Sequence, residues 1–175
     1  MKSRLAYLVF VCVLFSGCDT LTDPESVFLS VEIDEICFEV DRLQNGILVS
    51  VLSDANTVLD IGPALARDNL SKDDVIGARL TDANLRLIFP VESNLTIIED
   101  AELNLIGSSG ARQVAALATF PASRNASLTP SSTDVSSIVR AASFQASLQF
   151  DGASDVNERV VIEGSITIEV EVQDI

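Results

Sequence analysis

A two-residue alternation of apolar and polar side chains in the C-terminal part of the chain most constrains its fold. In residues 159–172 (RVVIEGSITIEVEV), Ile and Val alternate with Ser, Thr and Glu, and residues 144–150 repeat the period with Phe, Ala and Leu. This period is typical of β-strands with one buried and one solvated face, as in antiparallel sheets. We expect these two strands to pair as a hairpin across residues 151–158.

The N-terminal part of the domain shows the same alternation with a change of phase. Apolar residues occupy alternate positions up to Ile33 and again from Ile36 to Val40, so the step between the two sets is odd. A β-bulge or tight bend near Asp34–Glu35 would keep both sets facing one core. Asn45–Gly46 is typical of a hairpin turn, here leading into a strand over residues 47–52.

Between these strands the pattern predicts short helices as well as further strands. Pro63 suits a first helical position, and Ser71 with the following aspartates suits a helix N-terminus. Further strands are expected over residues 78–89, around 101–107 and after Gly110, with helical turns at 93–100 and near Thr133. About eight strands with two or three short helical connections predict an all-β fold. We expect an antiparallel β-sandwich, immunoglobulin-like or jelly-roll-like, as one domain over residues 27–175.

The N-terminus has the organisation of an export segment. Lys2 and Arg4 precede the uncharged apolar run Leu5–Phe15, which is too short to span a bilayer. Two small residues, Ser16 and Gly17, then precede Cys18. Such an arrangement fits a signal-peptide hydrophobic region followed by a cleavage site.

This segment resembles the lipobox of bacterial lipoproteins, although Phe15 stands where that class usually has Leu. The resemblance covers residues 1–18 and implies a signal peptide over residues 1–17, cleavage before Cys18 and a tether over residues 18–26. It also implies a diacylglycerol on the Cys18 sulfur and an N-acyl chain such as palmitate. Two or more acyl chains anchor a protein stably to a membrane. The alternatives are an ordinary secretory signal and a short uncleaved anchor.

The expected mature chain is strongly acidic. The full sequence has a net charge of −15, and loss of Lys2 and Arg4 with the signal peptide makes this −17. Lys72 is then the only lysine, a composition similar to that of proteins from salt-loving organisms; a merely acidic, soluble surface protein is the alternative. Nucleic acid is not an expected partner, because binding phosphates requires a basic patch.

Residue types limit the chemistry. The sequence has no His and no Trp, and its one Tyr, Tyr7, lies in the signal segment. The commonest general base and metal ligand is therefore missing. A pair of carboxylates working as in a glycosidase remains conceivable, but we expect a non-enzyme without a cofactor. Cys37 lies between Ile36 and Phe38, so we expect a buried or half-buried side chain; a reactive thiol is the alternative.

One loop carries several oxygen ligands. Asp151, Asp155, Asn157 and Glu158 are candidate Ca²⁺ ligands, although their spacing does not match an EF-hand. Turn geometry alone also explains these residue types. This loop and the helical insertion over residues 60–77 are candidate contact surfaces.

These observations predict a secreted, lipid-anchored bacterial protein on the periplasmic face or the cell surface. We expect a binding or structural module that contacts the membrane through its anchor and another envelope protein through its domain. The alternative is a carrier of a lipid or another hydrophobic small molecule. Its apolar residues and six mature Phe would then enclose a cavity between the sheets.

The acidic surface predicts a stability that depends on salt. Lowering the salt concentration of the buffer from molar to millimolar should reduce the free energy of unfolding of residues 19–175, because repulsion between carboxylates is then less screened. Urea titrations at the two salt concentrations measure the effect. A flat salt dependence would contradict the halophilic interpretation.

Overall fold

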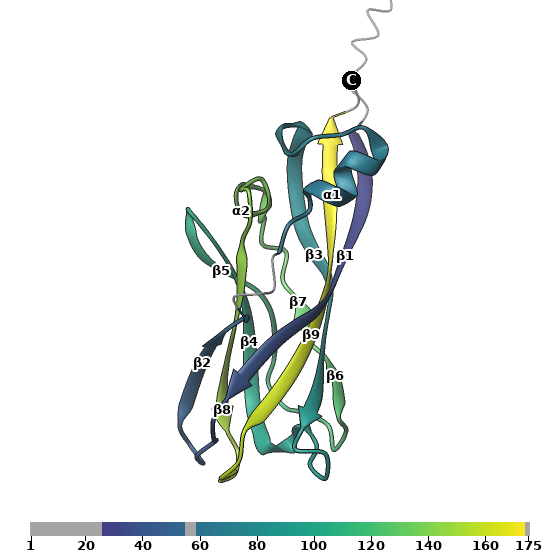
Figure 1. Cartoon of the computed structure of the whole chain (residues 1–175). Coiled ribbons are helices and arrows are strands. Elements are labelled where there is room, and N and C mark those ends of the chain that lie inside the picture. The colour runs from purple at the N-terminus through teal and green to yellow at the C-terminus, as the bar shows by residue number, and fades with distance from the viewer. Residues whose placement is uncertain (1–25, 55–58, 174–175) are drawn as a thin grey trace, which may run out of the picture.

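Two antiparallel sheets pack face to face in the computed structural model, which describes residues 26–54 and 59–173 (Figure 1). One sheet has the order β1-β9-β3-β6 and the other β2-β8-β4-β5-β7. The strands are β1 Ser26–Val40, β2 Leu48–Leu52, β3 Val75–Phe89, β4 Ile98–Gly107, β5 Gly110–Leu117, β6 Asn125–Ser127, β7 Thr129–Pro130, β8 Gln145–Gly152 and β9 Val160–Gln173. The expected all-β sandwich is confirmed.

The expected bulge in the first strand is also confirmed. β1 pairs with β9 along its whole length, and the register shifts between Ile33 and Ile36. At the shift, Glu35 adopts a left-handed backbone conformation with φ of 58°. Val31 before the bulge and Ile36 after it are both buried. The extra residue therefore turns both apolar sets towards the same core.

The two expected hairpins are wrong in their pairing. The Asn45–Gly46 turn forms, with Gly46 at φ of 69°, but the strands it joins lie in different sheets, because β1 pairs with β9 and β2 with β8. The 151–158 loop likewise leads from β8 in one sheet to β9 in the other. Alternation determines which face of a strand is buried. Strands on opposite sides of one core satisfy that requirement as well as neighbours do.

The core fills the space between the inner faces of the two sheets. Phe38 from β1 and Phe150 from β8 reach it from opposite sides and are both fully buried. Inward residues of β9 alternate with half-exposed ones from Val160 to Val172. All described core residues lie between Val31 and Val172. The chain from Asp19 onward thus contains the whole described core.

Short helices connect the strands where the sequence predicts them. They are α1 Gly62–Leu65, η1 Ala66–Asp68, η2 Lys72–Asp74, η3 Leu95–Ile97 and α2 Ser136–Val139, of which the η elements are 3₁₀ turns. Pro63 lies in the first turn of α1. Ser71 caps η2 with a reciprocal capping box, in which its hydroxyl accepts from Asp73 N–H and its own N–H donates to Asp74. The helix-start prediction is confirmed at both places.

Arg124 holds the connection between β3 and η3 together. Its guanidinium donates to five backbone carbonyl oxygens, including Leu87 at 2.5 Å, Ile88 at 2.8 Å, Pro90 at 2.9 Å and Ser93 at 3.0 Å, and that of Val91. Such charge-assisted bonds give donors to carbonyl oxygens at the end of β3 and in the turn that follows it. One side chain thus fixes the end of a long strand.

Replacing Arg124 should therefore destabilise the domain more than replacing other arginines does. Arg124→Met removes these five donated bonds, and we expect a loss of about 1–3 kcal/mol in the free energy of unfolding, measured with urea. Arg112→Met, at an exposed position in β5, is the matched control. Equal losses in the two variants would show that the carbonyl cluster contributes nothing.

Candidate functional site

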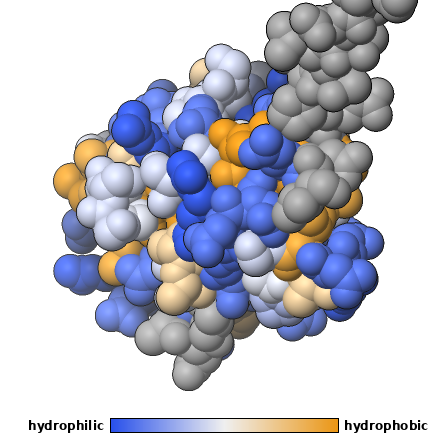
Figure 2. Space-filling model, turned by 90° about the horizontal axis from the view of Figure 1, so that it is seen from above, coloured by the Kyte–Doolittle hydropathy of each residue, from blue (hydrophilic) through white to orange (hydrophobic). Residues whose placement is uncertain are grey.

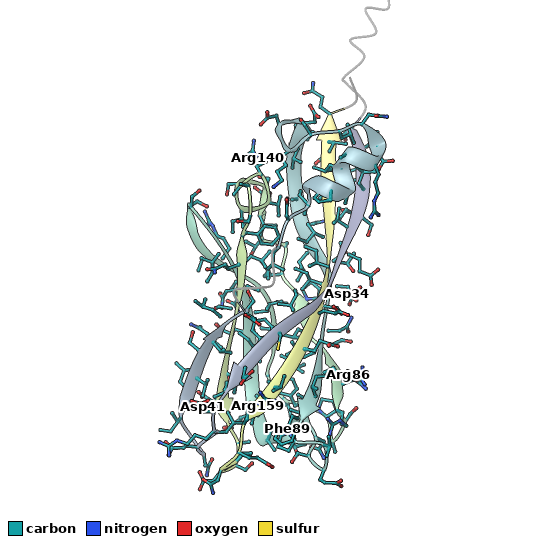
Figure 3. All side chains as sticks on the ribbon, in the orientation of Figure 1. Asp34, Asp41, Arg86, Phe89, Arg140 and Arg159 are labelled. Carbon is teal, nitrogen blue, oxygen red and sulfur yellow. The ribbon has the colours of Figure 1, made fainter. Side chains whose placement is uncertain are left out.

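An open groove crosses the outer face of the four-stranded sheet. Its volume is about 730 Å³, and all four strands of that sheet line it, together with Pro121. The polar side chains in its lining include Asp34, Glu35, Asn84, Arg86, Ser127 and Glu163. Asp34 and Arg86 point outward from this side of the molecule (Figure 3). The groove belongs to the sheet's solvent face and not to the core.

Strand geometry places these side chains rigidly. Asp34 and Glu35 lie in the β1 bulge, where Glu35 has a left-handed backbone conformation. Both residues line the groove. The Asn84 amide nitrogen donates to Asp82 at 2.6 Å, and its oxygen accepts from the Ser127 hydroxyl at 2.6 Å. The two bonds fix the amide between β3 and β6. A hydrogen-bonding surface on ordered strands suits recognition of a polar partner.

Arg86 supplies positive charge to an otherwise acidic groove. It lies directly opposite Glu163 in the β3–β9 register and is exposed. Elsewhere on the same face, Arg79 pairs with Glu169 at 2.6 Å and Arg159 with Glu39 at 3.2 Å. Exposed pairs of this kind contribute little to stability. They set the charge pattern that a partner would meet.

The helical insertion at residues 60–77 is attached to the sandwich by Lys72. The Lys72 ammonium lies 2.5 Å from an Asp60 carboxylate oxygen and donates to the carbonyls of Ala141 at 2.5 Å and Ala142 at 2.9 Å. Asp60 also accepts from the Gly62 N–H at 2.8 Å. From the sequence, Lys72 stood out only as the one lysine of the expected mature chain. Its partner loop is distant in sequence, so the local pattern could not reveal the contact.

Hydrogen bonds lower the pKa of three carboxyl groups, those of Asp60, Asp74 and Asp134. Burial tends to raise the pKa of Asp60, but the hydrogen bonds from Lys72 and the Gly62 N–H outweigh it and lower the pKa. Asp134 behaves alike, because bonds from Ser136 and the Ala78 N–H outweigh its burial. The Ser71 backbone N–H and hydroxyl lower the pKa of Asp74. All three act as caps or clamps of the fold.

The 151–158 loop lies at the other end of the sandwich from α1 (Figure 1). Its Val156 exchanges two backbone hydrogen bonds of 3.0 Å with Leu43, and Asp155 accepts from the Asn45 N–H at 2.9 Å. These two of the chain's connections between the sheets are therefore joined to each other by hydrogen bonds. The hydrogen bond from Asn45 to Asp155 explains an aspartate at this position without a bound ion. Within residues 26–54 and 59–173, no group of three or more carboxylates or thiols is arranged to hold a metal.

The expected mature chain has two cysteines, Cys18 and Cys37. Cys18, the expected lipidation site, lies outside the described residues. Cys37 is half-buried, as expected. Burial, followed by the charges of Glu39, Asp54 and Glu163, raises the pKa of the Cys37 thiol. The unreactive thiol form is therefore favoured over the thiolate.

The groove could not be predicted from the sequence because it joins residues from strands far apart in the chain.

Among the described residues, no helix has the length and apolar character needed to cross a membrane. Neither a family model nor a curated protein matches this sequence.

Removing the Asp60 carboxylate should change how stability depends on pH. A lowered pKa means that the stabilisation is present above the unfolded value, about 3.9, and is lost as the pH falls through the folded value. Asp60→Asn should thus be less stable than the parent at pH 6, and the difference should shrink at about pH 2.5. Urea titrations at both pH values measure it.

Asp68→Asn, an exposed carboxylate of the same insertion, is the matched control and should stay within about 0.5 kcal/mol of the parent. A difference for Asp60→Asn that is equally large at both pH values would contradict an ionised Asp60 as the cause.

Proposed function

We propose that this chain is a lipid-anchored, non-catalytic module of a bacterial cell envelope, which binds a polar partner across the outer face of its four-stranded sheet. The single observation that carries the binding role is the groove of about 730 Å³ lined by Asn84, Arg86 and the bulge carboxylates. Ordered strands present these polar groups to solvent. The sequence has no His to supply a general base, which favours recognition over catalysis.

The position of the tether supports a defined orientation on the membrane. β1 begins at Ser26, at the end of the sandwich that carries α1 (Figure 1). Seven residues lie between Cys18 and Ser26, and the eight Cα–Cα steps span at most about 29 Å. An anchored domain would keep the α1 end near the bilayer. The groove lies farther along the sheet, beside the bulge, where a partner could approach from the side.

The surface of the tethered end is compatible with a nearby bilayer. Viewed from that end, apolar patches interrupt the hydrophilic surface (Figure 2). Phe28 at the start of β1 and Ile76 at the start of β3 are 57% and 50% exposed. Apolar side chains beside an anchor add favourable contact with lipid.

The alternative of a carrier finds less support. The groove described above opens onto the surface, and Phe38 and Phe150 are fully buried between the sheets. A lipid carrier needs a concave, mostly apolar site. The groove lining instead includes carboxylates, an amide and a guanidinium.

Substituting Cys18 tests the anchor. The full chain expressed in a bacterium should sediment with membranes, whereas Cys18→Ser should move to the soluble fraction because the acylated thiol is absent. Cys37→Ser is the matched control and should stay with membranes. Intact mass measurement should show acyl chains on the parent and on Cys37→Ser but not on Cys18→Ser.

Native mass spectrometry of residues 19–175 then separates the module from the carrier. We expect the mass of the bare chain, also after incubation with a lipid extract. A reproducible non-covalent lipid would overturn the module in favour of carriage. If Cys18→Ser still sediments with membranes and keeps its acyl mass, the proposal of a lipid anchor on Cys18 is wrong.

A further inference from the structure

β2 forms an edge of the five-stranded sheet with an unusual surface. Its sequence, Leu48-Val49-Ser50-Val51-Leu52, is the same in both directions and contains no charge. Leu48 is 67% exposed and Leu52 53% exposed, while Val49 and Val51 are half-buried. In proteins that do not associate through an edge strand, charges, Pro or bulges usually protect that strand. This one carries two bare leucines instead.

The backbone of β2 points its unused groups away from the sheet. Ser53 N–H donates to the Ala146 carbonyl at 2.8 Å, and Gly152 N–H donates to the Ile47 carbonyl at 3.2 Å. In an antiparallel pair, bonding alternates along the strand. The odd-numbered residues therefore bond to β8, and the N–H and C=O groups of Leu48, Ser50 and Leu52 face outward. The edge ends where Asp54 N–H donates to the Cys37 carbonyl of β1.

We propose that β2 pairs with β2 of a second copy of this chain, antiparallel and centred on Ser50. A two-fold axis there places Leu48 opposite the partner's Leu52 and the two Ser50 residues opposite each other. The outward groups of the three residues then form about six backbone hydrogen bonds across the axis. The exposed leucines cover each other as cross-strand pairs. The two five-stranded sheets become one continuous sheet.

The palindrome favours a second copy over a different extended segment. An isologous interface needs one patch that complements itself, and LVSVL matches like with like at every position of the pair. Charge adds to this argument. The chain carries a net charge of −15, so two copies repel each other over most of their surfaces, whereas β2 brings no carboxylate of its own to the axis.

The surroundings of the edge predict a salt dependence. A hollow of about 270 Å³, lined by Cys37, Glu39, Leu52 and Asp54, lies where the edge meets β1. The partner's Leu48 would lie beside it. The net charge of −15 makes two copies repel each other, so salt should strengthen the association by screening that repulsion.

The expected dimer is weak in solution. Pairing five residues buries less than the roughly 1,200 Å² of standard interfaces, which places it among transient contacts. Confining chains to one surface raises their effective concentration and favours such contacts. The pairing itself needs only the sandwich, and it stands whether or not the proposed anchor is correct.

Opposite charges at the axis provide the decisive test. Sedimentation equilibrium of residues 19–175 at high protein concentration in molar salt should show a monomer–dimer equilibrium. Ser50→Glu and Ser50→Lys each place two like charges at the axis and should each weaken it at least tenfold. An equimolar mixture of the two variants should dimerise again. Thr81→Glu, an added charge at an exposed position of β3, is the matched control and should keep the parent equilibrium.

Cross-linking in membranes provides a second readout. In a Cys37→Ser background, Ser50→Cys in the full chain should yield a dimer band with a short bismaleimide, and the background alone should not. A parent chain that stays monomeric at all concentrations would overturn the proposal. So would dimers that persist in both charged variants, or a mixture of the variants that stays monomeric.

Discussion

The pairing of β9 with strands on both of its edges supports the rest of the structure. From Val160 to Gln173 it pairs with β1 on one side, and from Val161 to Val172 with β3 on the other. Every second side chain of β9 enters the core and the others form the outer face. One strand therefore organises both the hydrophobic interior and the floor of the groove. The alternation that is visible in its sequence has this double consequence.

The sequence predicted local features well because their causes are local. The odd step from Ile33 to Ile36 required an extra residue, and the bulge at Glu35 supplies it. The Ser71 cap depends on three neighbouring residues in the same way. Sheet membership has a different cause. The period of β8 is satisfied by burial against the core from either side, so sequence alone could not choose between a hairpin with β9 and a crossover to the opposite sheet.

The interaction surfaces depend on contacts between distant segments, which a single sequence does not show. The groove needs β1, β9, β3 and β6 side by side. Arg124 and Lys72 act on carbonyls of segments well separated from them in the chain. Nothing in the local sequence around either residue indicates these contacts. The edge position of β2 likewise emerges only from the strand order, although its palindrome and its lack of charge were present in the sequence throughout.

The distribution of the few cations connects fold and surface. Lys72 binds Asp60, Arg124 binds carbonyls, and Arg79 and Arg159 pair with glutamates on the outer face. These local contacts do not change the net charge of −15. The outer surface therefore keeps a strongly negative field, which disfavours non-specific association between copies. Against that field, a contact between two copies is least opposed at an uncharged strand edge. Among the described residues β2 is such an edge, because it carries no charge and combines exposed leucines with outward backbone groups.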